Sequence, residues 1–335
     1  MKISFHKLIC ILFCVIISCA KTDEAEVISA LQEAKYFLSS MECTDALSAL
    51  DEIGFQEDNA DYISVYASAQ ACKAGYKELD LFGGNLDSLA SASLITSLAA
   101  LSSSNETEPD SANFLALDGA ITTLLSYDGT AQPNTAARNI KFGTKKSGDI
   151  SLQALYLLFV QMGKFYALYG NAGINTTPDP DVPGSKGYGT FTNSCLFSYT
   201  TSDAIDWVTA SPAGTCTAAT GSEGSDFLES PVTAAVIKTR LCNGIIYYNN
   251  LMDILANVTL PGSDSLGDVG NIQTVLANLM SLAELAEAGA FNDGDANGVN
   301  AISALKSVTG QAACEAENIE RIEKFYAIFL ETIYQ

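Results

Sequence analysis

Cysteine is the residue type with the most evident chemistry in this 335-residue sequence. Six cysteines lie in the body of the chain: Cys43, Cys72, Cys195, Cys216, Cys242 and Cys314. No C-x-x-C pair occurs and the only histidine is His6, so zinc and thioredoxin-like sites have little support. An even number of cysteines in an oxidising compartment instead predicts three disulfides.

Spacing indicates how these cysteines could pair. Cys43 and Cys72 are placed symmetrically about the polar segment 54–59, which is typical of a turn between two helices. Antiparallel helices joined by this turn would bring the two thiols together. A bond between Cys195 and Cys216 would staple the least regular part of the chain. The last pair, by elimination, is Cys242 with Cys314.

One segment rich in Asp, Asn and Gly could bind a metal ion. Asp293, Asp295 and Asn297 place oxygen atoms at alternate positions, and a glycine follows. Calcium prefers such hard ligands, and the segment resembles the opening of a helix-loop-helix or dockerin calcium loop. It departs from that pattern at Ala304, where the loop would supply a bidentate glutamate. The alternative is a turn that caps a helix beginning near Val299. Calcium is the only cofactor that the sequence suggests.

Several aromatic residues follow a loop rich in proline and glycine. They are Tyr188, Phe191, Phe197, Tyr199 and Trp207. Such side chains can line a surface for a ligand or partner. They can equally pin a loop to the hydrophobic core.

Catalysis by a serine–histidine or cysteine–histidine pair needs a histidine, and none follows His6. Ser303 and Lys306 fit the pattern S-x-x-K, but the S-D-N and K-T-G motifs that accompany it in penicillin-recognising enzymes are absent. We therefore expect a protein that is not an enzyme.

The N-terminus has the layout of an export signal, with two lysines, a ten-residue apolar run and a small residue. The run is too short to span a membrane. Ile16-Ile17-Ser18-Cys19 resembles the bacterial lipobox, which implies cleavage before Cys19 and acylation of its thiol. In enteric lipoproteins an aspartate after this cysteine marks inner-membrane retention. The residue here is Ala20, which favours the outer membrane.

The net negative charge of the chain limits the classes of molecule that it is expected to bind. Cleavage before Cys19 would remove two of the 17 basic residues and none of the 39 acidic ones, leaving a formal charge of about −24. Nucleic acids need basic patches on their partners, so they are not expected. The expected partners are the membrane, through the N-terminal lipid, and other proteins of the cell envelope.

Apolar residues at helical spacing predict an all-α protein. Helices are expected over residues 27–38, 46–50, 62–72, 87–101, 111–126, 152–169, 231–258, 268–288 and 310–333. Gly54 and Gly75 are placed where helices stop, and Asp58 is placed where one starts. The segment 152–169 is apolar nearly all round, so it should form a central buried helix.

The first helices resemble a tetratricopeptide-type repeat. Ala34, Phe37, Ala46 and Leu50 match the small, aromatic, alanine and bulky positions of that repeat at its spacings of three, nine and four. The resemblance covers residues 27–75. It implies a stack of helical hairpins, and an ordinary helical bundle is the alternative.

The expected organisation has four parts. Residues 1–18 form a signal peptide and residues 19–25 a lipidated tether. Residues 26–130 form the tetratricopeptide-like lobe. Residues 131–335 form a second helical lobe, with an irregular, disulfide-stapled insert at about 171–225.

Two functions fit these features. The first is a lipid-anchored, non-catalytic interaction or assembly module of the cell envelope, because stacked helical hairpins create extended grooves. The second is a periplasmic accessory lipoprotein of a transport system that holds a small ligand.

Overall fold

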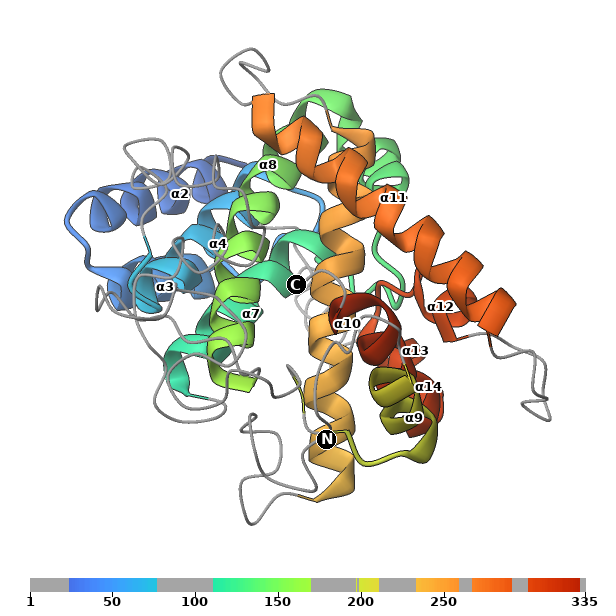
Figure 1. The fold of residues 1–335 in the computed structure, drawn as a ribbon. Helices are drawn as coiled ribbons and strands as arrows, with labels where there is room; N and C mark the ends of the chain where they lie inside the picture. Colours follow the sequence, from blue (N-terminus) through green and yellow to red (C-terminus); the bar gives the residue numbers. More distant parts are fainter. Residues whose placement is uncertain are drawn as a thin grey trace, which may run out of the picture.

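The computed structural model describes residues 24–76, 111–169, 197, 199–210, 233–258, 267–290 and 301–331. These residues form eleven α-helices and one π-helical turn, with no strand among them (Figure 1). The elements are α2 (Glu24–Ser39), α3 (Cys43–Asp51), α4 (Ala60–Lys73), α7 (Ala112–Leu125), α8 (Thr135–Tyr169), α9 (Ser202–Ala210), α10 (Ala234–Asn257), α11 (Gly267–Ala290), α12 (Ala301–Leu305), α13 (Gln311–Ala316), α14 (Ile319–Phe325) and η5 (Tyr326–Leu330). The all-α class is as predicted.

Helices α2, α3 and α4 form a compact unit around a small hydrophobic cluster. Val27, Leu31, Ala34, Ala46, Leu50, Tyr62, Val65 and Ala69 make up this cluster. Gly54 and Gly75 follow α3 and α4 with positive φ angles of 70° and 87°, as expected of residues that end helices. Helix α4 begins one residue later than Asp58 suggested, because the Asn59 side chain accepts a hydrogen bond from the Tyr62 amide.

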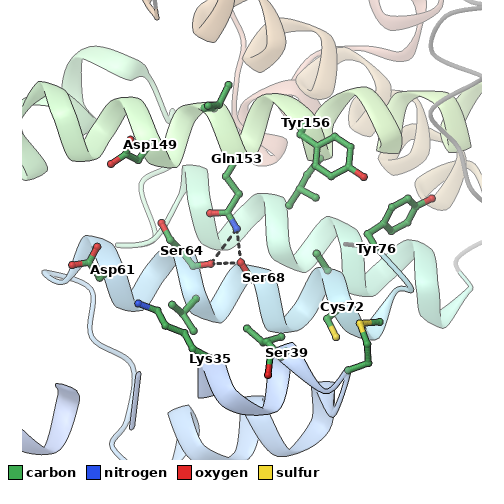
Figure 2. Close-up of a pocket in the computed structure, with 16 residues that line it drawn as sticks. Lys35, Ser39, Asp61, Ser64, Ser68, Cys72, Tyr76, Asp149, Gln153 and Tyr156 are labelled. Atoms are coloured by element: carbon green, nitrogen blue, oxygen red, sulfur yellow. Dashed lines mark hydrogen bonds between the residues drawn. The ribbon is translucent and has the colours of Figure 1, made fainter. Parts of the chain in front are cut away.

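A disulfide closes this unit. Cys43, at the start of α3, is bonded to Cys72, near the end of α4, with a Cα–Cα distance of 5.6 Å. This is the pairing that the spacing suggested. Figure 2 shows Lys35 of α2 toward the Asp61 end of α4 and Ser39 toward the Cys72 end, so α2 and α4 run in the same direction.

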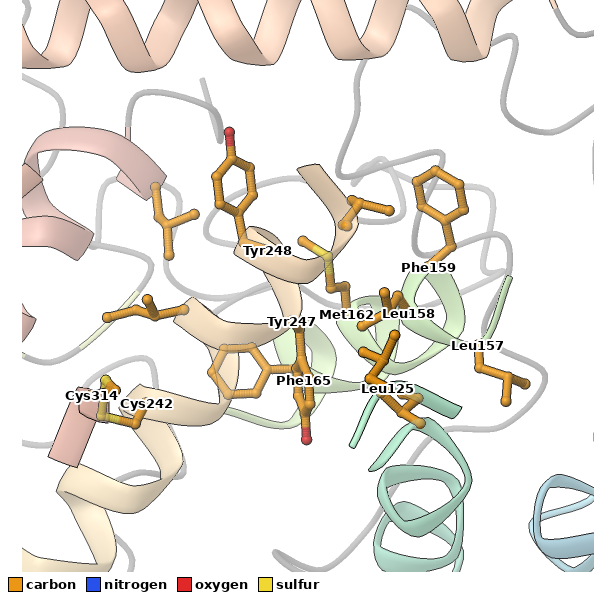
Figure 3. Close-up of a cluster of buried hydrophobic side chains, with 14 of the residues drawn as sticks. Leu125, Leu157, Leu158, Phe159, Met162, Phe165, Cys242, Tyr247, Tyr248 and Cys314 are labelled. Carbon is orange, nitrogen blue, oxygen red and sulfur yellow. A yellow bond between two sulfur atoms is a disulfide. The ribbon is translucent and has the colours of Figure 1, made fainter. Parts of the chain in front are cut away.

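The larger core lies between α4, α7, α8 and α10. Helix α8 is buried on nearly every side between Ala154 and Phe165, which agrees with the prediction for 152–169. It begins at Thr135, earlier than expected, and its course breaks at Gly143, where φ is 74°. Figure 3 shows α8 and α10 side chains meeting in this core, including Phe165 and Tyr247, whose ring centroids lie 6.1 Å apart.

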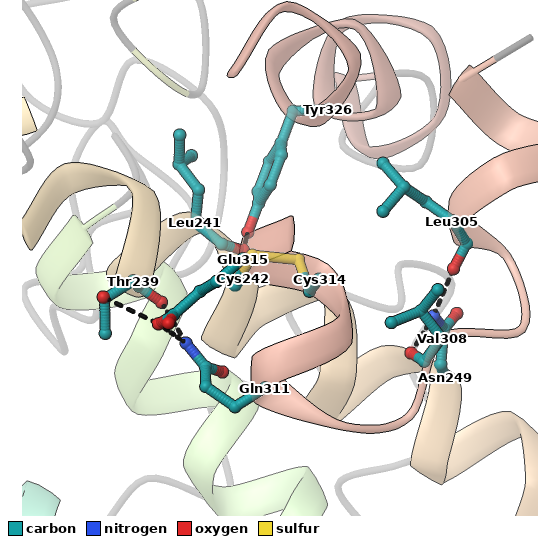
Figure 4. Close-up of a disulfide and its surroundings, with 10 residues drawn as sticks. All are labelled: Thr239, Leu241, Cys242, Asn249, Leu305, Val308, Gln311, Cys314, Glu315 and Tyr326. Carbon is teal, nitrogen blue, oxygen red and sulfur yellow. Dashed lines mark hydrogen bonds between the residues drawn. A yellow bond between two sulfur atoms is a disulfide. The ribbon is translucent and has the colours of Figure 1, made fainter. Parts of the chain in front are cut away.

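The C-terminal helices pack on α10. Cys242 of α10 is bonded to Cys314 of α13, with a Cα–Cα distance of 5.7 Å (Figure 4). The continuous helix expected over 310–333 is instead divided into α13, α14 and η5. The backbone is extended at Glu317 and Asn318, and the Asn318 side chain caps α14 by accepting from the Arg321 amide. The Asn318 cap therefore interrupts the segment 310–333, although its apolar residues recur at helical spacing throughout.

Two further findings concern location. The disulfides indicate an oxidising, extracytoplasmic compartment. In the part of the chain that the structure describes, no helix is long and apolar enough to cross a membrane.

Candidate functional site

A groove of about 780 Å³ runs between α2, α4 and α8 (Figure 2). We call it the graded groove. Its lining comprises Lys35, Leu38, Ser39, Met41, Asp61, Ser64, Val65, Ser68, Ala71, Cys72, Tyr76, Asp149, Leu152, Gln153, Tyr156 and Leu157. Each helix contributes residues spaced three and four apart, which places them on one face of that helix.

The groove changes in polarity along its length. Figure 2 shows Lys35, Asp61 and Asp149 at one end, and Cys72 and Tyr76 at the other. The distance along α4 from Asp61 to Cys72 is about 16 Å at 1.5 Å per residue. The groove is therefore charged at one end and apolar at the other.

The charged end is held in place by ion pairs between α8 and the start of α4. Lys146 pairs with Asp61, and Lys141 pairs with Asp58 at 2.8 Å. The carboxylate of Asp61 is thus already occupied by a lysine from the neighbouring helix. Lys35 and Asp149 are exposed and face the groove from α2 and α8.

A hydrogen-bonded group lies in the middle of the groove. The Gln153 side-chain amide donates to the Ser64 carbonyl at 3.1 Å and to the Ser68 hydroxyl at 2.8 Å. The Ser68 hydroxyl in turn donates to the Ser64 carbonyl at 2.9 Å. These bonds join α4 to α8 and hold the Gln153 side chain in one orientation.

The apolar end contains a strained residue. Met41 has a φ of 61°, in the left-handed region that non-glycine residues seldom adopt, and its side chain is 40% exposed. Its amide donates to the Leu38 carbonyl, and the Glu42 amide donates to the Phe37 carbonyl, so the turn closes the end of α2. The left-handed conformation of Met41 is therefore part of the ending of α2, and it places the side chain at the apolar end of the groove.

A buried lysine lies behind the apolar end. The Lys164 ammonium is 5.2 Å from the centroid of the Tyr76 ring. Burial lowers the pKa of Lys164 to about 8, because the low-polarity surroundings disfavour the charged form. Lys164 does not line the groove, but it contacts the ring of Tyr76, which does.

The structure places some of the predicted aromatic residues in the core. Phe197 is 2% and Tyr199 is 6% exposed, and Trp207 packs against the same core. The Tyr199 hydroxyl donates to Glu331 at 3.0 Å, and burial, with a smaller contribution from this carboxylate, raises the pKa of Tyr199. These side chains pin their segment to the core, which was the alternative to a binding surface. Tyr188 and Phe191 lie outside the described residues.

Other predicted sites also lie outside the described residues. They are Cys19, the pair Cys195 and Cys216, and the calcium candidates Asp293, Asp295 and Asn297. Where the structure does describe the chain, no group of three or more metal-binding side chains occurs. Ser303 and Lys306 both contact Glu284 Oε1, at 3.3 and 2.6 Å, on the surface.

Sequence reasoning missed the groove. The available signal was the pair Asp149 and Gln153, two polar residues one turn apart at the start of an apolar helix. That signal shows which face of α8 is polar, but it does not show which helices lie opposite.

Comparison with known proteins adds no relative. No protein family matches the chain, and neither a curated protein nor a solved structure shows significant similarity to it.

Proposed function

We propose that this protein is a lipid-anchored, non-catalytic binding module of the cell envelope, and that the graded groove is its binding site. The observation that carries the proposal is the groove's graded lining, which offers charges, hydrogen-bonding groups and apolar side chains in succession. Its volume falls within the range of sites that bind small ligands.

The anchor in this proposal rests on the lipobox resemblance. Acylation of Cys19 would leave residues 19–23 as the tether between the lipid and α2, two residues fewer than the expected 19–25, because α2 begins at Glu24. Ala20 favours the outer membrane. Helix α2 would then carry the groove about 20 Å from the tether, which is the length of the helix from Glu24 to Leu38.

The repeat resemblance is consistent with this site. In a tetratricopeptide-like arrangement, consecutive antiparallel helices leave a concave face along parallel first helices. Helices α2 and α4 run in the same direction with α3 between them, and α8 extends the same row.

Photo-crosslinking from the groove tests the proposal. We would place p-benzoylphenylalanine at Ser39 or Leu152, with Glu320 on α14 as an exposed control, and irradiate cells that make the full chain. The expected result is a mass adduct from both groove positions and none from the control. Equal labelling at all three positions, or none in the groove, would contradict it.

A protein segment is a second candidate occupant. The 16 Å along α4 corresponds to about five residues of extended chain. This is the interaction or assembly role that the sequence suggested. An adduct of polypeptide mass in the crosslinking experiment would favour it over a small ligand.

A further inference from the structure

We infer, on the basis of the proposed binding function, that the graded groove takes a single-chain amphiphile with a zwitterionic head group, of the lysophosphatidylethanolamine type. The inference combines three properties of the lining: two opposite charges at one end, hydrogen-bonding groups in the middle, and an apolar far end of limited length.

The charged end presents two separate charges of opposite sign. Lys35 lies on α2 and Asp149 lies on α8, so they face the groove from opposite walls. Asp61 is paired with Lys146, and within the described residues neither Lys35 nor Asp149 forms an ion pair. A phosphate beside Lys35 and an ammonium beside Asp149 would satisfy both charges.

A ligand with a single charge could form an ion pair with only one of the two residues, Lys35 or Asp149. An anionic head could pair with Lys35 but would bring a negative charge toward Asp149 and Asp61, in a protein that is already strongly acidic. A cationic head could pair with Asp149 but would repel Lys35. A zwitterion is the head group that avoids both repulsions.

The middle and the apolar end of the graded groove fit the glycerol and the acyl chain of a lysophospholipid. Ser64, Ser68 and Gln153 lie where the glycerol hydroxyl and ester of a lysophospholipid would follow its head group. Leu38, Met41 and Leu157 line the end where the acyl chain would lie. The head group and glycerol take up the charged end and the middle, so the acyl chain has the part of the groove from Ser68 to Cys72, which is about 6 Å along α4 and accommodates about five carbons. A single chain, rather than two, also suits a volume of about 780 Å³.

The test measures head-group selectivity by isothermal titration of the complete processed chain in amphipol. The probes are 14-carbon lysophosphatidylethanolamine, 14-carbon lysophosphatidylglycerol and tetradecylammonium, each below its aggregation concentration. We expect the zwitterionic probe to bind about fivefold more tightly than either singly charged probe. This ratio corresponds to about 1 kcal/mol for one exposed ion pair.

Variants identify the residues responsible. Lys35→Gln should weaken binding of the two phosphate probes about fivefold, and Asp149→Asn should weaken binding of the two ammonium probes by the same factor. Lys145→Gln and Asp203→Asn are matched controls, because both residues are exposed and neither lines the groove. The controls should leave all three affinities unchanged.

Chain length gives an independent readout. Affinity for the zwitterionic probes should rise about fourfold per added methylene over the first five or so carbons and then level off. Equal affinities for the three head groups, or equal effects of Lys35→Gln and Lys145→Gln, would overturn the amphiphile inference. If Ser39 crosslinks a polypeptide while no probe binds, this inference fails and the binding function stands. If neither occurs, both fail.

Discussion

The starts of α4 and α9, which lie in two different regions of the molecule, are stabilised in different ways. Helix α4 is capped by Asn59, the residue immediately before it. Helix α9 is capped by Glu323, which accepts hydrogen bonds from the amides and hydroxyls of Thr200 and Thr201 from more than 120 residues away. The first kind of cap can be read from neighbouring residues, and the second depends on the finished fold.

Two other helix starts also receive a distant carboxylate, and that of α8 has a local cap from Asn134 as well. At the start of α8, Asp253 accepts from the amide and hydroxyl of Thr135, both at 2.7 Å. At the start of α12, Glu287 accepts from the amides of Ala301 and Ile302. Burial raises the pKa of Glu287, although those two amides act in the opposite direction. Carboxylates thus accept hydrogen bonds from buried and partly buried N–H groups at helix starts, where the helix dipole favours negative charge. Part of the acidic excess therefore has a structural role.

Removal of each disulfide should give the largest effects. The Cys242–Cys314 bond spans 72 residues and the Cys43–Cys72 bond spans 29. Loop-closure entropy predicts losses of about 4.4 and about 3.6 kcal/mol of unfolding free energy for the paired alanine variants. Urea unfolding would measure both.

The two disulfide variants should differ more in binding than in stability. Cys72 lines the graded groove, so only loss of the Cys43–Cys72 bond should reduce crosslinking from Ser39. If loss of Cys242–Cys314 reduced it equally, the groove would depend on the whole core and not on the N-terminal unit.

Removing the distant cap of α9 and the local cap of α4 tests whether the two kinds of cap contribute differently to stability. Glu323→Ala leaves four donors of Thr200 and Thr201 without their acceptor in a buried site, and should cost about 3 kcal/mol. Asn59→Ala should cost about 1 kcal/mol. Urea unfolding of both variants provides the measurement, and similar losses would mean that distant caps contribute no more than local ones.

The buried lysine should make stability depend on pH. The pKa of Lys164 is about 8 in the folded protein and 10.5 when unperturbed, so the unfolded chain binds more protons between these values. Stability from this group therefore rises with pH across that window. Lys164→Met should be about 2 kcal/mol more stable than the wild type at pH 7, and this advantage should shrink toward pH 10.5. A difference between the two proteins that stays constant from pH 7 to 10 would show that Lys164 titrates normally.

The smallest expected effect concerns Met41, the residue with a left-handed conformation at the apolar end of the graded groove. Met41→Gly removes the cost of a left-handed conformation, so it should stabilise the protein by up to about 1 kcal/mol. It also removes an apolar side chain from the groove, so ligand affinity should fall. Thermal unfolding measures the change in stability, and titration with the zwitterionic probe measures the change in affinity. Ser40→Gly is the control, because Ser40 does not have a positive φ angle. Unchanged affinity in Met41→Gly would separate the strain from binding.

Features that depend on residues a few positions apart could be predicted before the structure was known. Helical periodicity indicated an all-α protein, Gly54 and Gly75 marked helix ends, and symmetry about a turn indicated the Cys43–Cys72 bond. The sequence also located the buried part of α8, because an apolar face on every side leaves only the interior for that helix.

Tertiary structure alone decided the features that join distant residues. Periodicity does not report the pairing of α8 with α2 and α4, so the graded groove could not be predicted from it. The caps from Asp253 and Glu323 were equally hidden, because a carboxylate more than 100 residues away carries no local signal. The sequence also could not show whether Phe197 and Tyr199 are exposed or buried. In the fold, Phe197 packs against Tyr326 and the Tyr199 hydroxyl donates to Glu331. Local hydrogen bonds and hydrophobic spacing act within a few turns of chain, whereas a binding site requires side chains that only folding brings together.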